Sequence, residues 1–575
     1  MGTGKESGGG TTPPEYEDYS EKEIGGETKN GKQEKARKKE RKIAVFDFET
    51  DPFKRGLIVK PFAWGFYDGD RYEEYWGDDA AETFWIFLQT LKDSHLIYAH
   101  NGGKFDFLFL LRYFSKQHCK IINGRIVSIH ALTHELRDSY AILPVPLKQS
   151  GNKKEIDYDK MERGRRWRHK KEILAYLYQD CVALYDMVIQ FRANLGTGLT
   201  MAGTATRLLR AITPEKVEQL TLEQDKDFRQ FFFGGRVECF EKGIVKDNLK
   251  LLDVRSMYPS VMKSNLHPIG NRYVESTDFD DNSDYVQLDC FSNGAFPLRD
   301  KNGLAFPKTR GVFFVTGHEL RAAMELRLVN ITRIIRAITF TRRGNFQQFV
   351  DEYTRLRKQA TDAGDEIGKL HYKLVQNSSY GRFALNPEKL YTWMIQHVGA
   401  ASPGDEWEPY SGGNDVIFWR KKVSDYEKMR AISNVATGAS ITGAARARLL
   451  YAIHSADRKI YCDTDSIIAR SIDVPEDDGQ LGSWQLEALG NKIAVAGKKL
   501  YAMFGEQPVN ENEKKKRIKL YGDETCIKLA SKGVRLTAQE IVRVCCGDTV
   551  TWRAETPSMG LDGSQTYMER RVVMR

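Results

Sequence analysis

Two aspartates interrupt an apolar run in the stretch Lys459-Ile460-Tyr461-Cys462-Asp463-Thr464-Asp465-Ser466-Ile467-Ile468. Because side chains alternate between the two faces of a strand, we expect Asp463 and Asp465 on one face and Thr464 on the other. The isoleucines favour strands, so the stretch predicts two strands joined by a tight turn, with the acids at the tip of the hairpin. Paired carboxylates suit Mg²⁺, which prefers oxygen ligands. A plain polar turn has the same composition, so other parts of the chain must separate the two interpretations.

Length and composition set only broad limits on the function. The 575 residues allow two or more domains, and the net charge of +9 is consistent with a polyanionic partner. The eight cysteines are scattered without C-x-x-C pairs, which favours a reducing compartment and argues against a zinc module. No apolar run reaches the roughly 18 residues of a membrane span, and the N-terminus lacks a signal-peptide core. We therefore expect a soluble, intracellular monomer.

Residues 1–41 contain almost no apolar side chains, and this composition predicts a disordered tail. The basic end of the tail, residues 32–42, is compatible with a nucleic-acid arm, a targeting signal or a solvated linker.

Order is expected to begin with a buried strand over residues 43–50, in which Asp47 and Glu49 share one face. A strand-turn-strand around residues 68–70 and a helix over residues 79–91 follow. The second carboxylate pair thus repeats the spacing of the first.

Two further acids lie at predicted element boundaries. A strand over residues 96–99 leads to Asp106, where an apolar helix over residues 107–113 begins. In a long helix over residues 171–191, Tyr176 and Asp180 are four residues apart and share a face. Four such carboxylates can hold two divalent ions about 3.5–4 Å apart that activate a water for phosphodiester hydrolysis. Each acid alone could equally be a helix cap or a surface residue.

The order D-x-E, N-x(2–3)-F-D and Y-x(3)-D resembles the three motifs of the proofreading 3′–5′ exonuclease domain of family B DNA polymerases. The resemblance implies an RNase H-like fold for residues 42–200. It implies that the metal ligands are Asp47, Glu49, Asp106 and Asp180, and that Tyr176 orients the attacking water.

The same resemblance implies contacts to the single-stranded 3′ end from Thr50, Asn101 and Phe105. The segment Asp138-Ser139-Tyr140 is similar to the family's Ser-Leu contact, with Tyr140 in place of leucine. A lysine that assists exonuclease chemistry in the protein-primed branch matches Lys153 or Lys154, and the sequence leaves the choice between them open.

A connector and loop are expected over residues 201–249. After a helix around residues 205–212 comes Phe231-Phe232-Phe233-Gly234-Gly235-Arg236, in which the paired glycines allow a close approach of backbone to a ligand. The protein-primed branch has a Tyr-x-Gly-Gly loop here that contacts template DNA. This chain has Phe232 where tyrosine is usual, which keeps the ring and loses the hydroxyl.

The strand Lys250-Leu251-Leu252-Asp253-Val254 is followed by Arg255-Ser256-Met257-Tyr258-Pro259-Ser260, which resembles polymerase motif A. The resemblance implies that Asp253 joins Asp465 and, less directly, Asp463 in a second metal centre that includes the main chain of Val254. It also implies that Tyr258 closes the space which a ribose 2′-hydroxyl would need.

A helix expected from about residue 346 ends in Lys369-Leu370-His371-Tyr372-Lys373-Leu374-Val375-Gln376-Asn377-Ser378-Ser379-Tyr380-Gly381. Spacings of four, four and three place Lys369, Lys373, Asn377 and Tyr380 along one face, as in many solvated helix surfaces. The string resembles motif B, which implies that Lys373 grips the incoming triphosphate and Lys369 supports it. Asn377 and Tyr380 would then bound the nascent base pair.

An alanine-rich helix is expected over residues 434–453, behind the sheet that carries the opening hairpin. Beyond the hairpin, Lys498-Lys499-Leu500-Tyr501 resembles the K-x-Y motif, in which Lys499 and Tyr501 hold the primer strand. The remainder mixes basic residues with the β-formers of residues 541–552 and suits a thumb that clasps duplex phosphates.

Taken together, the resemblance implies an α/β and α+β multidomain chain with a right-hand polymerase after the exonuclease domain. The implied parts are palm at 250–263 and 431–505, fingers and motif B at 346–384, and thumb at 506–575. Inserts at 264–345 and 385–430 match the places where protein-primed enzymes of phages, adenoviruses and linear plasmids bind the priming protein and encircle template. The implied partners are primer and template DNA, dNTPs and a terminal protein, with two Mg²⁺ ions per centre, replaceable by Mn²⁺.

Three alternatives stay open. A family B polymerase that uses only nucleic-acid primers would share every motif above. An inactive DNA-binding replication protein would not need every acid. A reverse transcriptase would show adjacent aspartates rather than the spaced pair and would not explain the exonuclease motifs.

Overall fold

The computed structural model describes residues 41–147, 156–214, 216–301, 303–413, 415–431, 434–477, 479–505, 519–521 and 524–574. The predicted tail, apart from Arg41, lies outside these residues, and so do Lys153 and Lys154. Among the described helices, none is long and apolar enough to cross a membrane.

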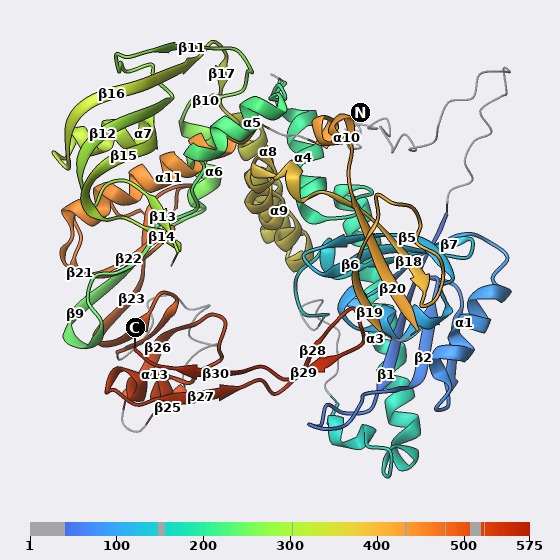
Figure 1. The fold of residues 1–575 in the computed structure, drawn as a ribbon. Helices are drawn as coiled ribbons and strands as arrows, with labels where there is room; N and C mark the ends of the chain where they lie inside the picture. The colour runs from blue at the N-terminus through green and yellow to red at the C-terminus, as the bar shows by residue number, and fades with distance from the viewer. Residues whose placement is uncertain are drawn as a thin grey trace, which may run out of the picture. The chain divides into compact units, whose positions relative to one another are not determined.

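A ten-stranded sheet carries the first acid pair (Figure 1). Its strands, in spatial order, are β19 (Glu408–Gly413), β20 (Val416–Lys422), β18 (Tyr391–His397), β5 (Lys116–Ile122), β6 (Arg125–Ala131), β7 (His134–Asp138), β4 (His95–Ala99), β1 (Lys42–Thr50), β2 (Pro61–Tyr67) and β3 (Tyr72–Trp76). Strands β1, β4 and β7 run parallel to one another, and the other pairs are antiparallel. The second predicted insert thus extends the sheet of the first domain, because β18 pairs with β5.

Helices cover both faces of this sheet. Phe46 and Phe48 of β1 pack with α1 (Ala80–Thr90) and α2 (Asp106–Leu110) on one side. Val45 packs with α3 (Lys170–Leu195) on the other. The predicted strands and helices of this region are confirmed. The one difference is that the helix expected over residues 107–113 is a short α-helix, α2, which continues as a 3-10 helix, Leu111–Tyr113. Asp47 and Glu49 therefore face α3.

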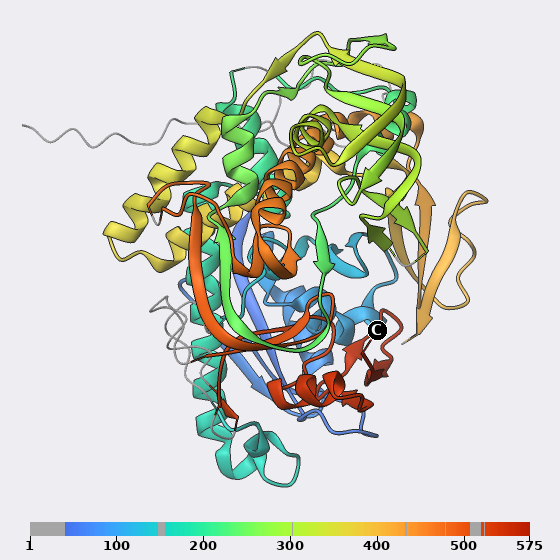
Figure 2. The ribbon, with the colours of Figure 1, turned by 90° about the vertical axis from the view of Figure 1, so that its left-hand side faces the viewer.

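An eight-stranded antiparallel sheet carries the second acid pair. Its spatial order is β25 (Lys519–Tyr521), β26 (Glu524–Ser531), β24 (Leu500–Phe504), β23 (Trp484–Gly497), β9 (Gly243–Val254), β22 (Ser466–Ser471), β21 (Asp457–Asp463) and β8 (Val237–Cys239). Strands β9 and β23 run side by side as a long curved pair (Figure 2), and two register shifts along the pair account for the bend.

The predicted hairpin is confirmed as β21 and β22, but the expected alternation of its acids is wrong. Asp463 ends β21, whereas Asp465 lies in the turn. The reason is Thr464, whose φ of +60° takes the chain out of extended geometry between the two acids.

A four-stranded sheet occupies the first predicted insert, in the order β11 (Tyr273–Ser276), β16 (Val329–Phe340), β12 (Tyr285–Asn293) and β15 (Lys308–Thr316). Helix α7 (Gly317–Glu325) follows it and packs on α11 (Val435–Ser455), the predicted alanine-rich helix. The two helices approach closely, since a Cβ at Gly443 would lie 2.3 Å from Thr316 Oγ1. Helix α11 also packs, as expected, with core residues of β9 and of the hairpin.

The prediction of one continuous helix from residue 346 is wrong, because the structure has two helices there. Helix α8 (Gln347–Asp362) ends before Gly364, which has a φ of +70°, and α9 (Glu366–Ser378) begins after Asp365. A left-handed glycine followed by an N-cap aspartate stops one helix and starts the next. Tyr380 begins a 3-10 helix, Tyr380–Ala384, that follows α9 after Ser379.

The β-formers of residues 541–552 are divided between a helix and a strand. Helix α13 (Ala538–Cys545) forms there because Thr537 and Glu540 make a capping box. Only β27 (Val550–Arg553) is a strand, paired with β30 (Glu569–Val572). Helix α4 (Met201–Ile212) confirms the predicted connector helix. The remaining α-helices and strands that the structure describes are α5 (Leu222–Phe228), α6 (Met257–Ser264), α10 (Asp425–Ala431), β10 (His267–Pro268), β13 (Leu298–Asp300), β14 (Gly303–Ala305), β17 (Arg343–Gly344), β28 (Ser558–Met559) and β29 (Gln565–Thr566).

Candidate active sites

Asp253 and Asp465 approach each other where two inner strands of the eight-stranded sheet, β9 and β22, end and begin. Asp253 is opposite Ser466 in the β9–β22 ladder, and the amide of Val254 donates to the carbonyl of Asp465 at 2.7 Å. Burial and then the charge of Asp465 raise the pKa of Asp253 to about 8. Burial and then the charge of Asp463 raise the pKa of Asp465 to about 6. Crowded carboxylates of this kind favour a shared cation or proton.

Asp463 is bound differently from the other two acids. Its carboxylate oxygens lie 2.6 and 2.5 Å from Nζ of Lys499. The hydroxyls of Tyr461 and Thr464 donate to the same carboxylate at 3.3 and 3.0 Å. Tyr501 is buried and packs its ring on Tyr461, with centroids 4.8 Å apart. The two residues of the predicted K-x-Y motif are thus attached to the acid hairpin.

The predicted template loop packs on the same turn. A Cβ at Gly235 would lie 2.6 Å from Thr464 Oγ1, so only glycine fits there. The amide of Thr464 donates to the carbonyl of Arg236 at 2.7 Å. Gly234 is exposed, and Phe232 is half-buried in an apolar cluster behind the loop.

Tyr258 and Tyr380 come together although they lie far apart in sequence. Their rings stack with centroids 4.0 Å apart. Lys373 and Asn377 are exposed on α9, and Lys369 pairs with Glu366 at 3.2 Å on the same helix.

The four acids of the first domain converge around Cys181 of α3. Burial raises the pKa of its thiol well above the ordinary value, and the negative charges of Asp47, Asp180, Glu49 and Asp106 raise it further. Burial raises the pKa of Asp106 to about 7. One carboxylate oxygen of Asp106 has no hydrogen-bond partner among the described residues.

Tyr176 lies beside the same acids on α3. Burial and then the charge of Asp180 raise its pKa. Its hydroxyl is 3.4 Å from the hydroxyl of Tyr158, which is exposed.

Both centres present carboxylate oxygens, which are the ligands that hard divalent ions prefer. In the described ranges, no group of three or more His, Cys, Asp or Glu side chains forms a ready metal site. The buried, mutually repelling carboxylates and the orphaned oxygen of Asp106 nevertheless fit a hard cation, because binding would offset both penalties.

Arg125 joins the predicted single-strand contacts, and sequence reasoning missed it. Its Nη1 donates to Asn101 Oδ1 at 2.8 Å and to Asp138 at 2.5 Å, and its guanidinium lies 4.8 Å from the centre of the Tyr140 ring. Ser139 is fully buried, with its hydroxyl 3.0 Å from a ring nitrogen of His100. No local motif marks Arg125, which follows a two-residue Asn-Gly turn.

Phe105 and Thr50 lie at the rim of this centre. The ring of Phe105 meets that of Phe53 edge to face, with centroids 5.7 Å apart. Thr50 is half-buried, at a register shift that ends the β1–β2 ladder.

Glu487 and Lys528 were also missed. Their ion pair of 2.5 Å joins β23 to β26. The charge of Glu487 raises the pKa of Asp253 and that of Lys528 lowers it, so both lie beside the acid pair. Neither residue belongs to a recognisable motif.

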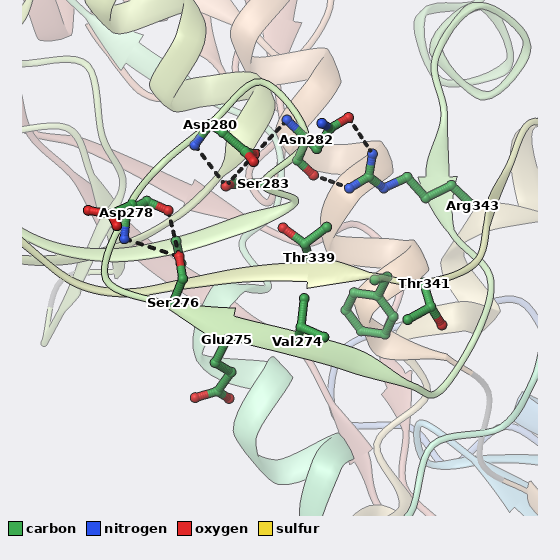
Figure 3. A pocket seen from close by; sticks show the side chains of 12 residues that line it. Val274, Glu275, Ser276, Asp278, Asp280, Asn282, Ser283, Thr339, Thr341 and Arg343 are labelled. Carbon is green, nitrogen blue, oxygen red and sulfur yellow. Dashed lines mark hydrogen bonds between the residues drawn. The ribbon is translucent and has the colours of Figure 1, made fainter.

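A surface hollow of about 470 Å³ lies elsewhere, in the insert sheet (Figure 3). Its lining includes Glu275, Asp278, Asp280 and Arg343 and none of the predicted site residues. Asp280 accepts hydrogen bonds from Asn282 and Ser283 within its own turn. We therefore place the chemistry at the two carboxylate centres and not in this hollow.

Comparisons with known proteins identify the family to which the chain belongs. The chain matches the family model described as DNA polymerase type B, organellar and viral, over residues 32–480. It is 46% identical over 511 residues to the DNA-directed DNA polymerase of Enterobacteria phage PRD1, covering 88% of each chain. It is 24% identical over 527 residues to the DNA polymerase of Bacillus phage phi29, covering 80% of this chain and 86% of that one.

A solved structure has the same fold. Phi29 DNA polymerase complexed with primer-template DNA matches with a TM-score of 0.70 at 19% identity, covering 93% of this chain and 100% of that chain. The same enzyme with primer-template DNA and incoming nucleotide substrates gives the same values. The chain therefore belongs to the organellar and viral type B DNA polymerases.

Proposed function

We propose that this DNA-directed DNA polymerase joins a deoxynucleotide to a primer 3′-hydroxyl at Asp253 and Asp465. The observation that carries the proposal is the approach of these two carboxylates across the β9–β22 ladder, where the charge of Asp465 raises the pKa of Asp253. Two Mg²⁺ ions, replaceable by Mn²⁺, would lower the pKa of the attacking hydroxyl and stabilise the departing pyrophosphate. Asp253, Asp465 and the main chain of Val254 would hold the ions.

The remaining residues of this centre bind and orient the substrates. Lys373, exposed on α9, grips the triphosphate with support from Lys369, and Asn377 and Tyr380 bound the new base pair. Tyr258 excludes a ribose 2′-hydroxyl. Asp463 and Lys499 brace the hairpin, and Lys499 and Tyr501 hold the primer end.

A second centre removes misincorporated nucleotides from the 3′ end. Asp47, Glu49, Asp106 and Asp180 hold its metal ions, and Tyr176 orients the water. Asn101, Phe105, Thr50 and Tyr140 hold the single strand, with Arg125 positioning Asn101 and Tyr140. Convergence of the four charges on Cys181 supports this assignment.

The parts of the chain are assigned accordingly. Residues 42–200 form an RNase H-like exonuclease domain, residues 201–249 the connector and template loop, and residues 250–263 and 431–505 the palm. Residues 346–384 form the fingers, residues 506–575 the thumb, and residues 385–430 an insert for processivity and strand displacement.

Initiation uses a hydroxyl of a separate terminal protein, which docks on the insert of residues 264–345. The outer face of its sheet supports this role, because Phe291 and Val312 are 42% and 45% exposed there. These two side chains lie diagonally across the β12–β15 ladder, since Phe291 is opposite Arg310 and Val312 opposite Asp289. Two adjacent exposed apolar side chains offer a partner protein an apolar contact, because covering them removes apolar surface from water. Phe291→Lys with Val312→Lys should block terminal-protein initiation and leave extension of a DNA primer intact.

Single-nucleotide addition to a labelled primer–template tests the polymerase assignment. Wild type with Mg²⁺ and the complementary dNTP should add one nucleotide, and Asp465→Asn should add none. The matched control Asp473→Asn, at an exposed acid just after β22, should behave as wild type. Unimpaired addition by Asp465→Asn would contradict the assignment.

A further inference from the structure

We infer that the ion pair between Glu319 and Arg446 is a positioning device for the polymerase centre. It holds the loop Phe233–Arg236, and that loop holds the turn at Thr464 between the two acids of the hairpin. This inference rests on the proposed polymerase function and adds to it a pair that touches no substrate.

The ion pair is buried and fully bonded. Arg446 of α11 is 3% exposed and Glu319 of α7 is 1% exposed. Nε and Nη2 of the guanidinium donate to the two carboxylate oxygens at 2.7 and 2.9 Å. Thr316 completes the shell, since its hydroxyl donates to the same carboxylate at 2.9 Å. Such a planar fork fixes the orientation of the guanidinium, which a lysine ammonium could not do.

The remaining nitrogen of Arg446 holds the loop. Nη1 donates to the carbonyls of Phe233 and Gly234 at 2.5 and 2.9 Å. The next two residues of the loop, Gly235 and Arg236, are those that contact Thr464. The path from the insert helix to the catalytic turn therefore consists of one ion pair and four consecutive loop residues.

The turn needs this external support. Thr464 is β-branched and has a φ of +60°, a conformation that such residues rarely adopt and that persists only when its surroundings enforce it. Its amide donates to the loop carbonyl of Arg236, and its side chain rests against Gly235. Because Asp463 and Asp465 flank Thr464, a shift of the loop displaces the carboxylates.

A direct substrate contact is disfavoured for Arg446 in this arrangement, because the residue is 3% exposed and each of its three guanidinium nitrogens already donates to Glu319 or to the loop. Glu319 comes from the insert that we propose as the docking site of the terminal protein.

The test uses the full chain with Glu319→Gln and Arg446→Met combined. Glutamine keeps the helix cap at position 319, and methionine removes the cation, so no uncompensated charge is buried. We expect kcat for nucleotide addition to fall about ten- to a hundredfold, as for a small misplacement of catalytic groups, with the KM for dNTP little changed. Degradation of single-stranded DNA should match wild type, which reports that the chain is folded.

A matched control is Arg458→Met, which removes from the same hairpin an arginine that also makes two parallel hydrogen bonds to a carboxylate. Arg458 pairs with Glu241 and Asp247, which are not part of the loop. It should leave kcat unchanged.

A folded double variant with wild-type kcat would overturn the inference. If the double variant does not fold, Arg446→Lys provides the test. Lysine keeps the buried positive charge but cannot make the two parallel hydrogen bonds to Glu319. A reduced kcat with normal degradation supports the inference, and a wild-type kcat contradicts it. If wild type itself adds no nucleotide, the proposed polymerase function fails, which is a different result.

Discussion

The phenol rings of Tyr258 and Tyr380 stack with centroids 4.0 Å apart and planes inclined by 22°. Tyr258 lies in the first turn of α6, five residues after Asp253, so Tyr380 holds it beside the acid pair. A ring fixed in this way restricts the space around the sugar of an incoming nucleotide.

Tyr258→Val should therefore weaken the selection against ribonucleotides. Loss of a steric contact of this size is worth about 1–3 kcal/mol, or a 10- to 200-fold change in the ratio of kcat/KM for dNTP and rNTP. Tyr258→Phe, which retains the ring, is the control and should keep the wild-type ratio. An unchanged ratio in the valine variant would rule out Tyr258 as the selecting residue.

Asp253 should make the metal-free protein less stable as pH rises. Its folded-state pKa of about 8 lies above the ordinary value of 3.8, so folding takes up a proton between these limits. Stability falls with pH wherever the folded state holds more protons, and here the loss runs from about pH 4 to pH 8. With EDTA present, Asp253→Asn should raise Tm at pH 8 by about 2 °C or more and leave it unchanged near pH 4.

Added Mg²⁺ distinguishes this effect from a general one. It should raise the Tm of wild type at pH 8 more than that of Asp253→Asn, because only the carboxylate binds the ion. Equal responses would mean that Asp253 is not a ligand.

Removal of the Lys499 charge should shift the pH dependence of nucleotide addition through Asp465. Its positive charge lowers the pKa of Asp465, opposing burial and the charge of Asp463. Lys499→Met should thus move the acidic limb of the kcat–pH profile of nucleotide addition to higher pH. Lys499→Arg keeps the charge and should leave the limb in place. If the acidic limbs of the kcat–pH profiles of Lys499→Met and wild type coincide, the Asp465 carboxylate does not govern this limb.

Arg125 should matter for degradation and not for synthesis. Arg125→Lys keeps a charge opposite Asp138 but cannot hold Asn101 and the Tyr140 ring at the same time. We expect degradation of single-stranded DNA to slow about tenfold, with nucleotide addition unaffected. Arg71→Lys, at an exposed Arg71–Glu73 ion pair where β3 begins, is the control. Wild-type degradation by Arg125→Lys would remove Arg125 from the site.

Elements with strong local signals could be predicted from the sequence. Strand alternation correctly placed Phe46 and Phe48 on one face of β1 and Asp47 and Glu49 on the other, and α3 begins and ends within a few residues of its expected bounds. The acid hairpin was predictable because β-branched residues flank a short polar turn.

Features that depend on distant partners could not be predicted. The left-handed Thr464 relies on Gly235 and Arg236, so strand alternation misplaced Asp465. The pairing of β18 with β5 joins segments with no local relationship. Arg125 and Glu487 act through long-range contacts and belong to no motif, whereas the acids were found because their motifs are short and ordered.

The most direct test is extension of a DNA-primed single-stranded circle with Mg²⁺ and dNTPs, alongside degradation of a labelled single strand. Wild type should do both, Asp465→Ala should only degrade, and Asp47→Ala should only synthesise, because the two carboxylate centres are separate. Products longer than the circle would further support strand displacement. Loss of both activities in either single variant, with the variant folded, would contradict the assignment of two independent centres.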